Sequence, residues 1–173
     1  MSERWDILND DGEPTGRTML RGNGMLSAGE YHLVVHIWVL SADGKILIQR
    51  RSMRKKLMPG EWAATGGAAI AGEDSFTAAS RELYEELGIP SDRKTLFPLT
   101  RIKRRNSLLD VWVITTDLSV KQLRLQKSEV AEVRWVTEEE LKQMIASGKF
   151  HHYGNTYFDT VFSEISKYRG AMV

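Results

Sequence analysis

The sequence contains no cysteine, which excludes disulfide bonds, thiolate metal sites and cysteine nucleophiles. No apolar run approaches the roughly 18 residues that a membrane-spanning helix needs, so no membrane partner is expected. The net charge is only +1, which gives no support for bulk attraction to nucleic acid. The opening residues MSERWDILND lack the basic start and apolar stretch of a signal peptide, and we expect a cytoplasmic protein.

The rest of the composition is that of an ordinary globular protein, with 42% hydrophobic and 27% charged residues. A length of 173 residues suits one domain with a substantial core. No repeat, low-complexity tract or linker divides the chain, so we expect a single domain over residues 1–173, with residues 1–29 as a hairpin or loop extension. The phosphate-loop pattern G-x-x-x-x-G-K-[ST] is also missing, so nucleotide hydrolysis of that type is not supported.

Residue patterns predict strands separated by turns and interleaved with helices. The expected strands are residues 5–8, 32–40, 45–50, 62–65, 95–104, 110–116 and 130–136, whereas residues 13–31 are weakly patterned and are expected to be loop. The turn 41–44 predicts that 32–40 and 45–50 form a hairpin. Further helices are expected from the capping box at Thr137 to about Ala146 and from about Tyr157 to Tyr168. The class is therefore mixed α/β.

The segment Ser75 to Leu87 is predicted to be the first helix. Either Asp74 or Ser75 can cap its start, and Gly88 is suited to end it. Its apolar residues recur at helical spacing and predict one buried face, made of Phe76, Ala79, Leu83 and Leu87.

Three glutamates, Glu82, Glu85 and Glu86, stand at helical offsets that place all of them on one face. Unpaired like charges at this spacing destabilise a helix by about 0.2–0.5 kcal/mol. A bound cation reverses that sign, and Mg2+ prefers hard oxygen ligands while it bridges carboxylates to phosphates. The alternative for such a cluster in isolation is a solvated acidic face.

The residues from Gly67 to Ile89 match G-x5-E-x7-R-E-U-x-E-E-x-G-U, where U is a bulky aliphatic residue. This segment resembles the Nudix box at all nine fixed positions. The resemblance implies an α/β/α sandwich with a mixed sheet. It also implies Mg2+-dependent hydrolysis of a diphosphate linkage in a nucleoside diphosphate derivative, with Mn2+ as the alternative ion. Its metal ligands would be Glu82, Glu85 and Glu86.

Other positions have expected roles in the same chemistry. Gly67 lets the backbone approach a ligand, and Arg81 can pair with Glu85 four residues later and orient it. Glu73 reaches the metal cluster or the loop backbone, or it simply occupies the start of the helix. The resemblance leaves the general base open between a glutamate of the box, such as Glu85, and one in a later loop. Glu129 is the first candidate in that loop, and Glu132 is the second.

The upstream run from Glu30 to Trp62 resembles the branch of Nudix proteins that is related to isopentenyl-diphosphate isomerase. Basic residues there precede the metal helix, and we expect Arg50, Arg51 and Lys55 to contact substrate phosphates. The isomerases carry a catalytic cysteine and a metal-binding histidine where this chain has Gly66 and Ala68. This departure indicates a hydrolase, in which His32 is a relic or a hydrogen-bonded strand residue.

Several alternatives stay open at this point. A non-catalytic Nudix domain that binds a nucleotide or a partner protein is the second hypothesis, and an isomerase is the third. Trp62 or Trp112 is a candidate for stacking on a nucleobase, and the adjacent His151 and His152 are interpreted as loop residues. The residues do not identify the substrate, and they leave open whether the protein forms a homodimer.

Overall fold

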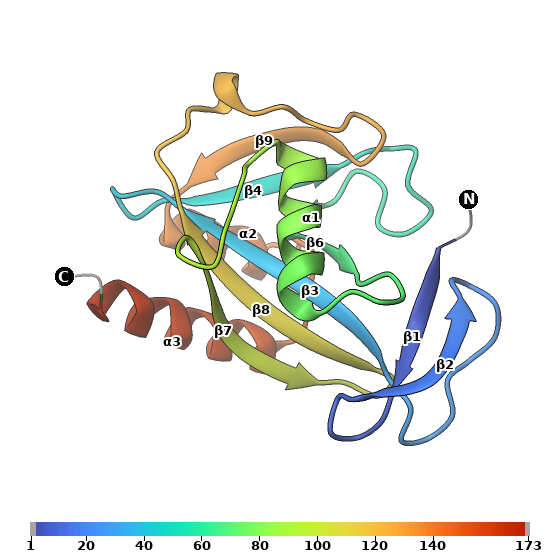
Figure 1. The fold of residues 1–173 in the computed structure, drawn as a ribbon. Helices are drawn as coiled ribbons and strands as arrows, with labels where there is room; N and C mark the ends of the chain where they lie inside the picture. The colour runs from blue at the N-terminus through green and yellow to red at the C-terminus, as the bar shows by residue number, and fades with distance from the viewer. Residues whose placement is uncertain (1–2, 172–173) are drawn as a thin grey trace.

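The computed structural model describes residues 3–171, and its centre is a seven-stranded mixed sheet with helices on both faces (Figure 1). The N-terminal sheet contains β1 (Arg4–Leu8) and β2 (Pro14–Leu20). The central sheet contains β3 (His32–Leu40), β4 (Ile46–Arg51), β5 (Trp62–Ala63), β6 (Thr65–Ala68), β7 (Leu96–Lys103), β8 (Ser107–Thr115) and β9 (Val130–Val136). The helices are α1 (Ser75–Leu87), the short 3-10 helix η1 (Val120–Gln122), α2 (Glu138–Ala146) and α3 (Asn155–Ala171).

The two faces of β3 belong to two different cores. Val35, Ile37 and Val39 pack in the cluster that contains α1, whereas Trp38 and Leu40 pack in the cluster that contains α2 and α3. Alternate residues of a strand point to opposite faces, so this strand needs apolar residues on both. The helices α1 and α3 lie on opposite sides of the sheet (Figure 1). The expected α/β/α arrangement with a mixed sheet is confirmed.

The prediction that β3 and β4 form a simple hairpin is wrong beyond the turn. Only Val39–Leu47 and Leu40–Ile46 are paired between them. Past that point β6 takes the place beside β3, and β5 takes the place beside β4. On their other edges β3 pairs in parallel with β8, and β4 pairs with β9, along their whole lengths. A local turn signal reports only the first pairs, and the later pairings are decided by segments far along the chain. The divergence of β3 and β4 opens the sheet beside α1.

The prediction that residues 13–31 are loop is also wrong in part, because β2 pairs antiparallel with β1. The first five residues of β2 are exposed, so the strand has no apolar alternation that could reveal it. The hairpin is attached to the rest of the fold by a bridge between Leu8 and Tyr31. Figure 1 shows it projecting at the end of the central sheet near the start of α1.

The single strand expected over residues 62–65 is instead divided at Ala64 into β5, which pairs with β4, and β6, which pairs with β3. The other elements follow the prediction with small shifts of boundary. The bounds of α1, β9 and α2 are confirmed, and Asp74 rather than Ser75 caps α1. The third helix begins at Asn155 and reaches Ala171, beyond the expected limits. Strand β8 begins at Ser107, three residues before the expected start at residue 110. Within residues 3–171, no helix is both long enough and apolar enough to cross a membrane.

We predict that Gly66→Ala destabilises the protein. A Cβ at this position would overlap the carbonyl oxygen of Val35 and lie 3.0 Å from Cα of His36, both of them backbone atoms of β3 that cannot move aside cheaply. Overpacking of this kind typically costs about 1–3 kcal/mol, which urea unfolding would measure. Gly170→Ala is the control, because nothing lies within 4 Å of its added Cβ. Equal unfolding midpoints for the two variants would contradict the prediction.

Candidate functional site

Helix α1 holds the acidic residues of the box in a fixed orientation. The Asp74 side chain accepts a hydrogen bond of 2.7 Å from the backbone N–H of Thr77 and caps the helix start. Gly88 adopts a left-handed conformation with φ of 73° and ends the helix, since its N–H donates to the carbonyl of Tyr84. The fully buried Leu83 anchors the opposite face against the sheet. The acidic face is therefore turned toward the opening between β3 and β4.

A cavity of about 340 Å³ lies at this opening. Its walls come from α1, from β3 and β6, from the loop after β4 and from the loop before β9. The residues of the box that line it are Gly67, Ala68, Arg81, Glu82, Glu85 and Glu86. Segments that are distant in sequence thus surround the three glutamates on several sides.

Glu86 is the most deeply placed of the three glutamates, with 3% of its surface exposed. Its Oε2 accepts hydrogen bonds from Nε2 of Gln49 at 2.9 Å and from the backbone N–H of Gly66 at 3.4 Å. The hydroxyl of Thr65 donates to Oε1 of Gln49 and fixes the orientation of that amide. Burial, and then the nearby charge of Glu82, raise the pKa of Glu86 to about 8.

Glu82 lies one turn earlier, against Gly67. Burial raises its pKa, although the guanidinium of Arg81 acts in the opposite direction. A Cβ at Gly67 would overlap Oε1 of Glu82 and lie 2.9 Å from its Oε2. Any side chain at this position would therefore displace the Glu82 carboxylate, and glycine leaves room for it.

Arg81 connects the carboxylates of the box. It makes two hydrogen bonds to Glu73, at 2.7 and 2.9 Å, and further bonds to Glu82 at 2.9 Å and to Glu85 at 3.2 Å. The expected pairing with Glu85 is present, but Glu73 is the main partner. Glu73 also accepts from the backbone N–H of Ile70. Both of its oxygens are therefore committed to Arg81 and to the loop, and it is absent from the cavity lining.

Within residues 3–171, no three histidine, aspartate or glutamate side chains already converge on a point that could hold a metal ion. Arg81 draws Glu82 and Glu85 to itself, while Gln49 holds Glu86. The donor chemistry nevertheless fits a hard divalent cation, because two desolvated carboxylates with raised pKa values share one wall. A cation beside them would lower both pKa values and offset the unfavourable burial of their charge.

The predicted basic residues divide into two groups. Arg51 and Lys55 line the cavity, and Lys55 forms an ion pair with Glu129, which lines it too. Arg50 does not line it, because its Nε donates to the carbonyl of Gly60 at 3.0 Å and its side chain lies 3.8 Å from Glu132. Successive residues of β4 point to opposite faces, which separates Arg50 from Arg51. Glu132 lies outside the cavity together with Arg50.

Sequence reasoning missed several residues that line the cavity, among them Trp5, His36 and Tyr153. The two expected tryptophans are placed elsewhere: Nε1 of Trp112 donates to Ser75, and Trp62 packs under the guanidinium of Arg134. The strand period could have indicated His36, since it shares a face of β3 with His32. Nothing in the sequence indicated that the N-terminal hairpin brings Trp5 to this cavity.

The adjacent histidines His151 and His152 do not act together. Nδ1 of His151 lies 2.7 Å from Glu61, and Nε2 of His152 lies 3.1 Å from Oδ1 of Asn155. Their side chains therefore have separate partners, which agrees with their interpretation as loop residues.

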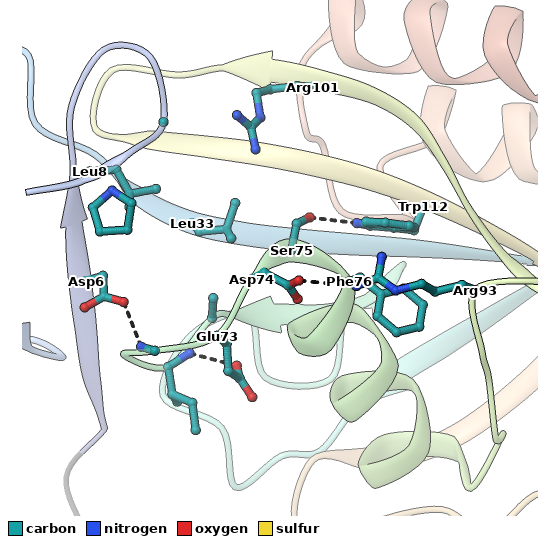
Figure 2. A pocket seen from close by; sticks show the side chains of 15 residues that line it. Asp6, Leu8, Leu33, Glu73, Asp74, Ser75, Phe76, Arg93, Arg101 and Trp112 are labelled. Carbon is teal, nitrogen blue, oxygen red and sulfur yellow. Dashed lines mark hydrogen bonds and ion pairs between the residues drawn. The ribbon is translucent and has the colours of Figure 1, made fainter.

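A second, larger hollow of about 560 Å³ lies at the start of α1, under the N-terminal hairpin (Figure 2). Its polar side chains already have partners within the protein. Arg101 is paired with Asp110 at 2.6 Å, Trp112 donates to Ser75 at 3.0 Å, and Asp6 accepts from the N–H of Gly72 at 2.7 Å. The smaller cavity is the candidate site, because its carboxylates are desolvated and face basic side chains.

Comparison with known proteins places these residues in a family. The model of the NUDIX domain matches residues 30–154. An uncharacterized Nudix hydrolase of Listeria monocytogenes is 41% identical over 152 residues, which are 87% of this chain and 89% of the relative. The uncharacterized Nudix hydrolase YfcD of Escherichia coli K12 is 34% identical over 146 residues, 81% of this chain and 77% of the relative.

Solved structures show the same fold. The crystal structure of DR0079 from Deinococcus radiodurans has a TM-score of 0.77 and 26% identity, and the match covers 91% of this chain and 97% of that one. The NUDIX domain of NrtR from Shewanella oneidensis, solved in complex with ADP ribose, has a TM-score of 0.60 and 16% identity. The match covers 78% of this chain and 88% of that one.

We predict that Arg81→Lys destabilises the protein by about 1–3 kcal/mol, because lysine cannot donate two parallel hydrogen bonds and leaves Glu73 incompletely paired. The Glu73 side chain is only 11% exposed. Arg93→Lys is the matched control, since the Arg93 side chain is 72% exposed and we expect a change within about 0.5 kcal/mol. Chemical denaturation of both variants would test this, and similar losses would contradict it.

Proposed function

The chain belongs to the Nudix hydrolase family, whose members act on pyrophosphate bonds, and we propose that this protein hydrolyses a diphosphate linkage in a metal-dependent reaction. The observation that carries the proposal is one cavity that combines two desolvated carboxylates on α1 with the basic side chains Arg51 and Lys55. The carboxylates suit a divalent cation, and the basic residues suit the phosphates that such a cation accompanies.

Glu82, Glu85 and Glu86 would hold the ion, with Mg2+ as the expected species and Mn2+ as the alternative. When bound, such an ion neutralises phosphate charge and makes a water more acidic. Gln49 keeps Glu86 turned toward the cavity through its hydrogen bond of 2.9 Å. Arg81 holds Glu82 and Glu85 through one nitrogen and anchors itself on Glu73. We assign Arg81 an orienting role rather than a contact with substrate.

Glu129 is the side chain that we propose as the general base. It lines the cavity on the loop before β9, where Lys55 pairs with it. The same lysine would be attracted to an incoming phosphate, which would release the carboxylate to accept a proton from water. Glu132, the second candidate from the sequence, lies outside the cavity and is not proposed. Glu85 is retained as the alternative base within the box.

An isomerase function is disfavoured by the backbone around Gly66, because any Cβ there would overlap the carbonyl oxygen of Val35. A cysteine at this position would require β6 to move away from β3. The resemblance to the isomerase-related branch therefore extends to the basic loop and not to isomerase chemistry. A non-catalytic binding domain is the other candidate. Turnover by the native protein that is lost in the variants below would separate an enzyme from such a domain.

The proposed substrate is a nucleoside diphosphate derivative or a related organic pyrophosphate. The structurally similar Shewanella domain bound ADP ribose, which makes ADP-ribose a suitable first substrate to assay. Cleavage of a diphosphate linkage replaces one P–O–P bond with two phosphate groups, and water supplies the added oxygen. Release of phosphate groups from a panel of such compounds with Mg2+ is the direct test.

We predict that Glu85→Gln and Glu86→Gln each abolish Mg2+-dependent turnover without unfolding α1. Each replaces a carboxylate ligand of the metal with an amide of similar shape. Metal binding can also be measured without an assay of turnover, by thermal unfolding. Saturating Mg2+ should raise the Tm of the native protein by several degrees, since about 1 kcal/mol of binding free energy shifts Tm by about 2–4 °C at this size. The shift should be smaller in both variants.

Glu132→Gln is the matched control for these variants, because it makes the same change at an exposed glutamate outside the cavity. It should keep both turnover and the Mg2+ shift. Native turnover in Glu85→Gln or Glu86→Gln would contradict the assignment of the metal ligands.

We also predict that Glu129→Gln lowers kcat by about a hundredfold or more while KM changes little, as expected when a general base is lost. Steady-state kinetics on the most active compound of the panel would measure both constants. A variant with reduced affinity and an unchanged kcat would instead assign Glu129 to substrate binding.

A further inference from the structure

Two histidines of β3, His32 and His36, line the cavity of the candidate site. One ring nitrogen of each is hydrogen-bonded, and the two partners differ in kind. His32 stands at the end of the cavity near the N-terminal hairpin, where its ring stacks on Trp5 at a centroid distance of 4.2 Å. His36 stands next to the box, since its register partner in β6 is Gly66, whose N–H donates to Glu86. The two rings therefore face different parts of a bound molecule.

The tautomer of His32 follows from its partner. Nδ1 lies 2.9 Å from the carbonyl oxygen of Asn106, which can only accept, so Nδ1 carries the proton. Burial lowers the pKa of His32, which favours the neutral ring. Its Nε2 is then an acceptor toward the cavity.

The tautomer of His36 is set by a chain of hydrogen bonds that begins in the core. Nε1 of Trp38 donates to the hydroxyl oxygen of Tyr157 at 3.1 Å, and that oxygen lies 2.8 Å from Nδ1 of His36. Tyr157 is 3% exposed, and its hydroxyl has no other partner within residues 3–171. If Nδ1 carried the proton, the hydroxyl proton of Tyr157 would be buried without an acceptor, which is costly. Tyr157 therefore donates to Nδ1, and the proton of the His36 ring resides on Nε2.

The environment keeps this ring neutral. His36 is 8% exposed, and burial, followed by the charges of Arg104 and His151, lowers its pKa to about 3. Within residues 3–171, Nε2 of His36 has no hydrogen-bond partner, and it is not among the fully enclosed polar atoms. The N–H consequently reaches the cavity as a donor without a net charge.

We propose that His36 is a substrate-contacting residue whose Nε2–H donates to a phosphate oxygen of the bound diphosphate, and that Tyr157 of α3 is the positioning residue that fixes this polarity. Phosphate oxygens at neutral pH are acceptors, so a donor matches them and an acceptor does not. His32, with its acceptor nitrogen, is suited instead to a hydroxyl or N–H of the group attached to the diphosphate. The proposal rests on the proposed function, because it assumes that the diphosphate lies beside Glu86.

The tautomers are measured directly by two-bond ¹H–¹⁵N correlation NMR on the full chain. We expect His36 to be protonated at Nε2 and His32 at Nδ1 near neutral pH. Methylenediphosphonate, a diphosphate analogue that cannot be hydrolysed at its bridge, should shift the Nε2–H signal of His36 when it is added with Mg2+. Protonation of His36 at Nδ1, or no shift at a concentration that saturates the protein, would overturn the proposal.

Variants test the polarity of the contact. His36→Leu should raise the Kd for methylenediphosphonate about tenfold to a hundredfold, the range expected for one hydrogen bond to a charged group. His36→Gln should recover part of the affinity, because its amide can place an N–H near the same point. His152→Gln is the matched control, since His152 bonds Asn155 outside the cavity and the Kd should not change.

Tyr157→Phe removes the hydroxyl that fixes the tautomer, and the NMR spectrum should then show His36 with mixed protonation and a raised Kd. If this variant does not fold, the two His36 variants still decide the matter. An unchanged Kd in His36→Leu, together with a loss of binding in Glu86→Gln, would overturn the role of His36 and leave the proposed function standing. An unchanged Kd in Glu86→Gln would contradict the proposed function itself. The NMR measurement of the His36 and His32 tautomers does not depend on that result.

Discussion

The burial of two carboxylates on one turn of α1 is the constraint on which the rest of the site depends. Glu82 and Glu86 lie where water is largely excluded, and burial raises the pKa of each. Groups in such a position need either a proton, a hydrogen-bond donor or a cation. Gln49, Gly66 and Arg81 supply hydrogen-bond donors. The negative charge that these donors do not compensate is suited to a divalent cation.

The surrounding fold supplies that environment through the divergence of β3 and β4. After two paired positions, β6 replaces β4 beside β3, and β5 replaces β3 beside β4. The opening lets side chains from both strands reach the acidic face of α1. It also brings α3 into the site indirectly, since Tyr157 is hydrogen-bonded to His36 and packs against Tyr153, which both line the cavity.

Much of the fold was predictable because its signals are local. Helix α1 was recognised from an apolar stripe, an aspartate cap and a terminal glycine, all within one short segment. Strand β2 was missed because its residues are mostly exposed and carry no alternation. The pairing of β4 was misjudged because its partners β5 and β9 lie farther along the chain. Patterns report the environment of a segment, whereas pairing depends on which distant segment arrives beside it.

The same distinction applies to the site. The sequence by itself determined the acidic face of Glu82, Glu85 and Glu86, because helical geometry fixes their relative directions once the helix is assigned. Tertiary structure alone decided that Arg51 and Lys55 face these carboxylates while Arg50 faces away, and that Glu73 belongs to Arg81. It also brought His36 into hydrogen-bond contact with Tyr157, although the two are separated by 121 positions along the chain. Burial and hydrogen-bond polarity arise between segments, and they exist only after the chain has folded.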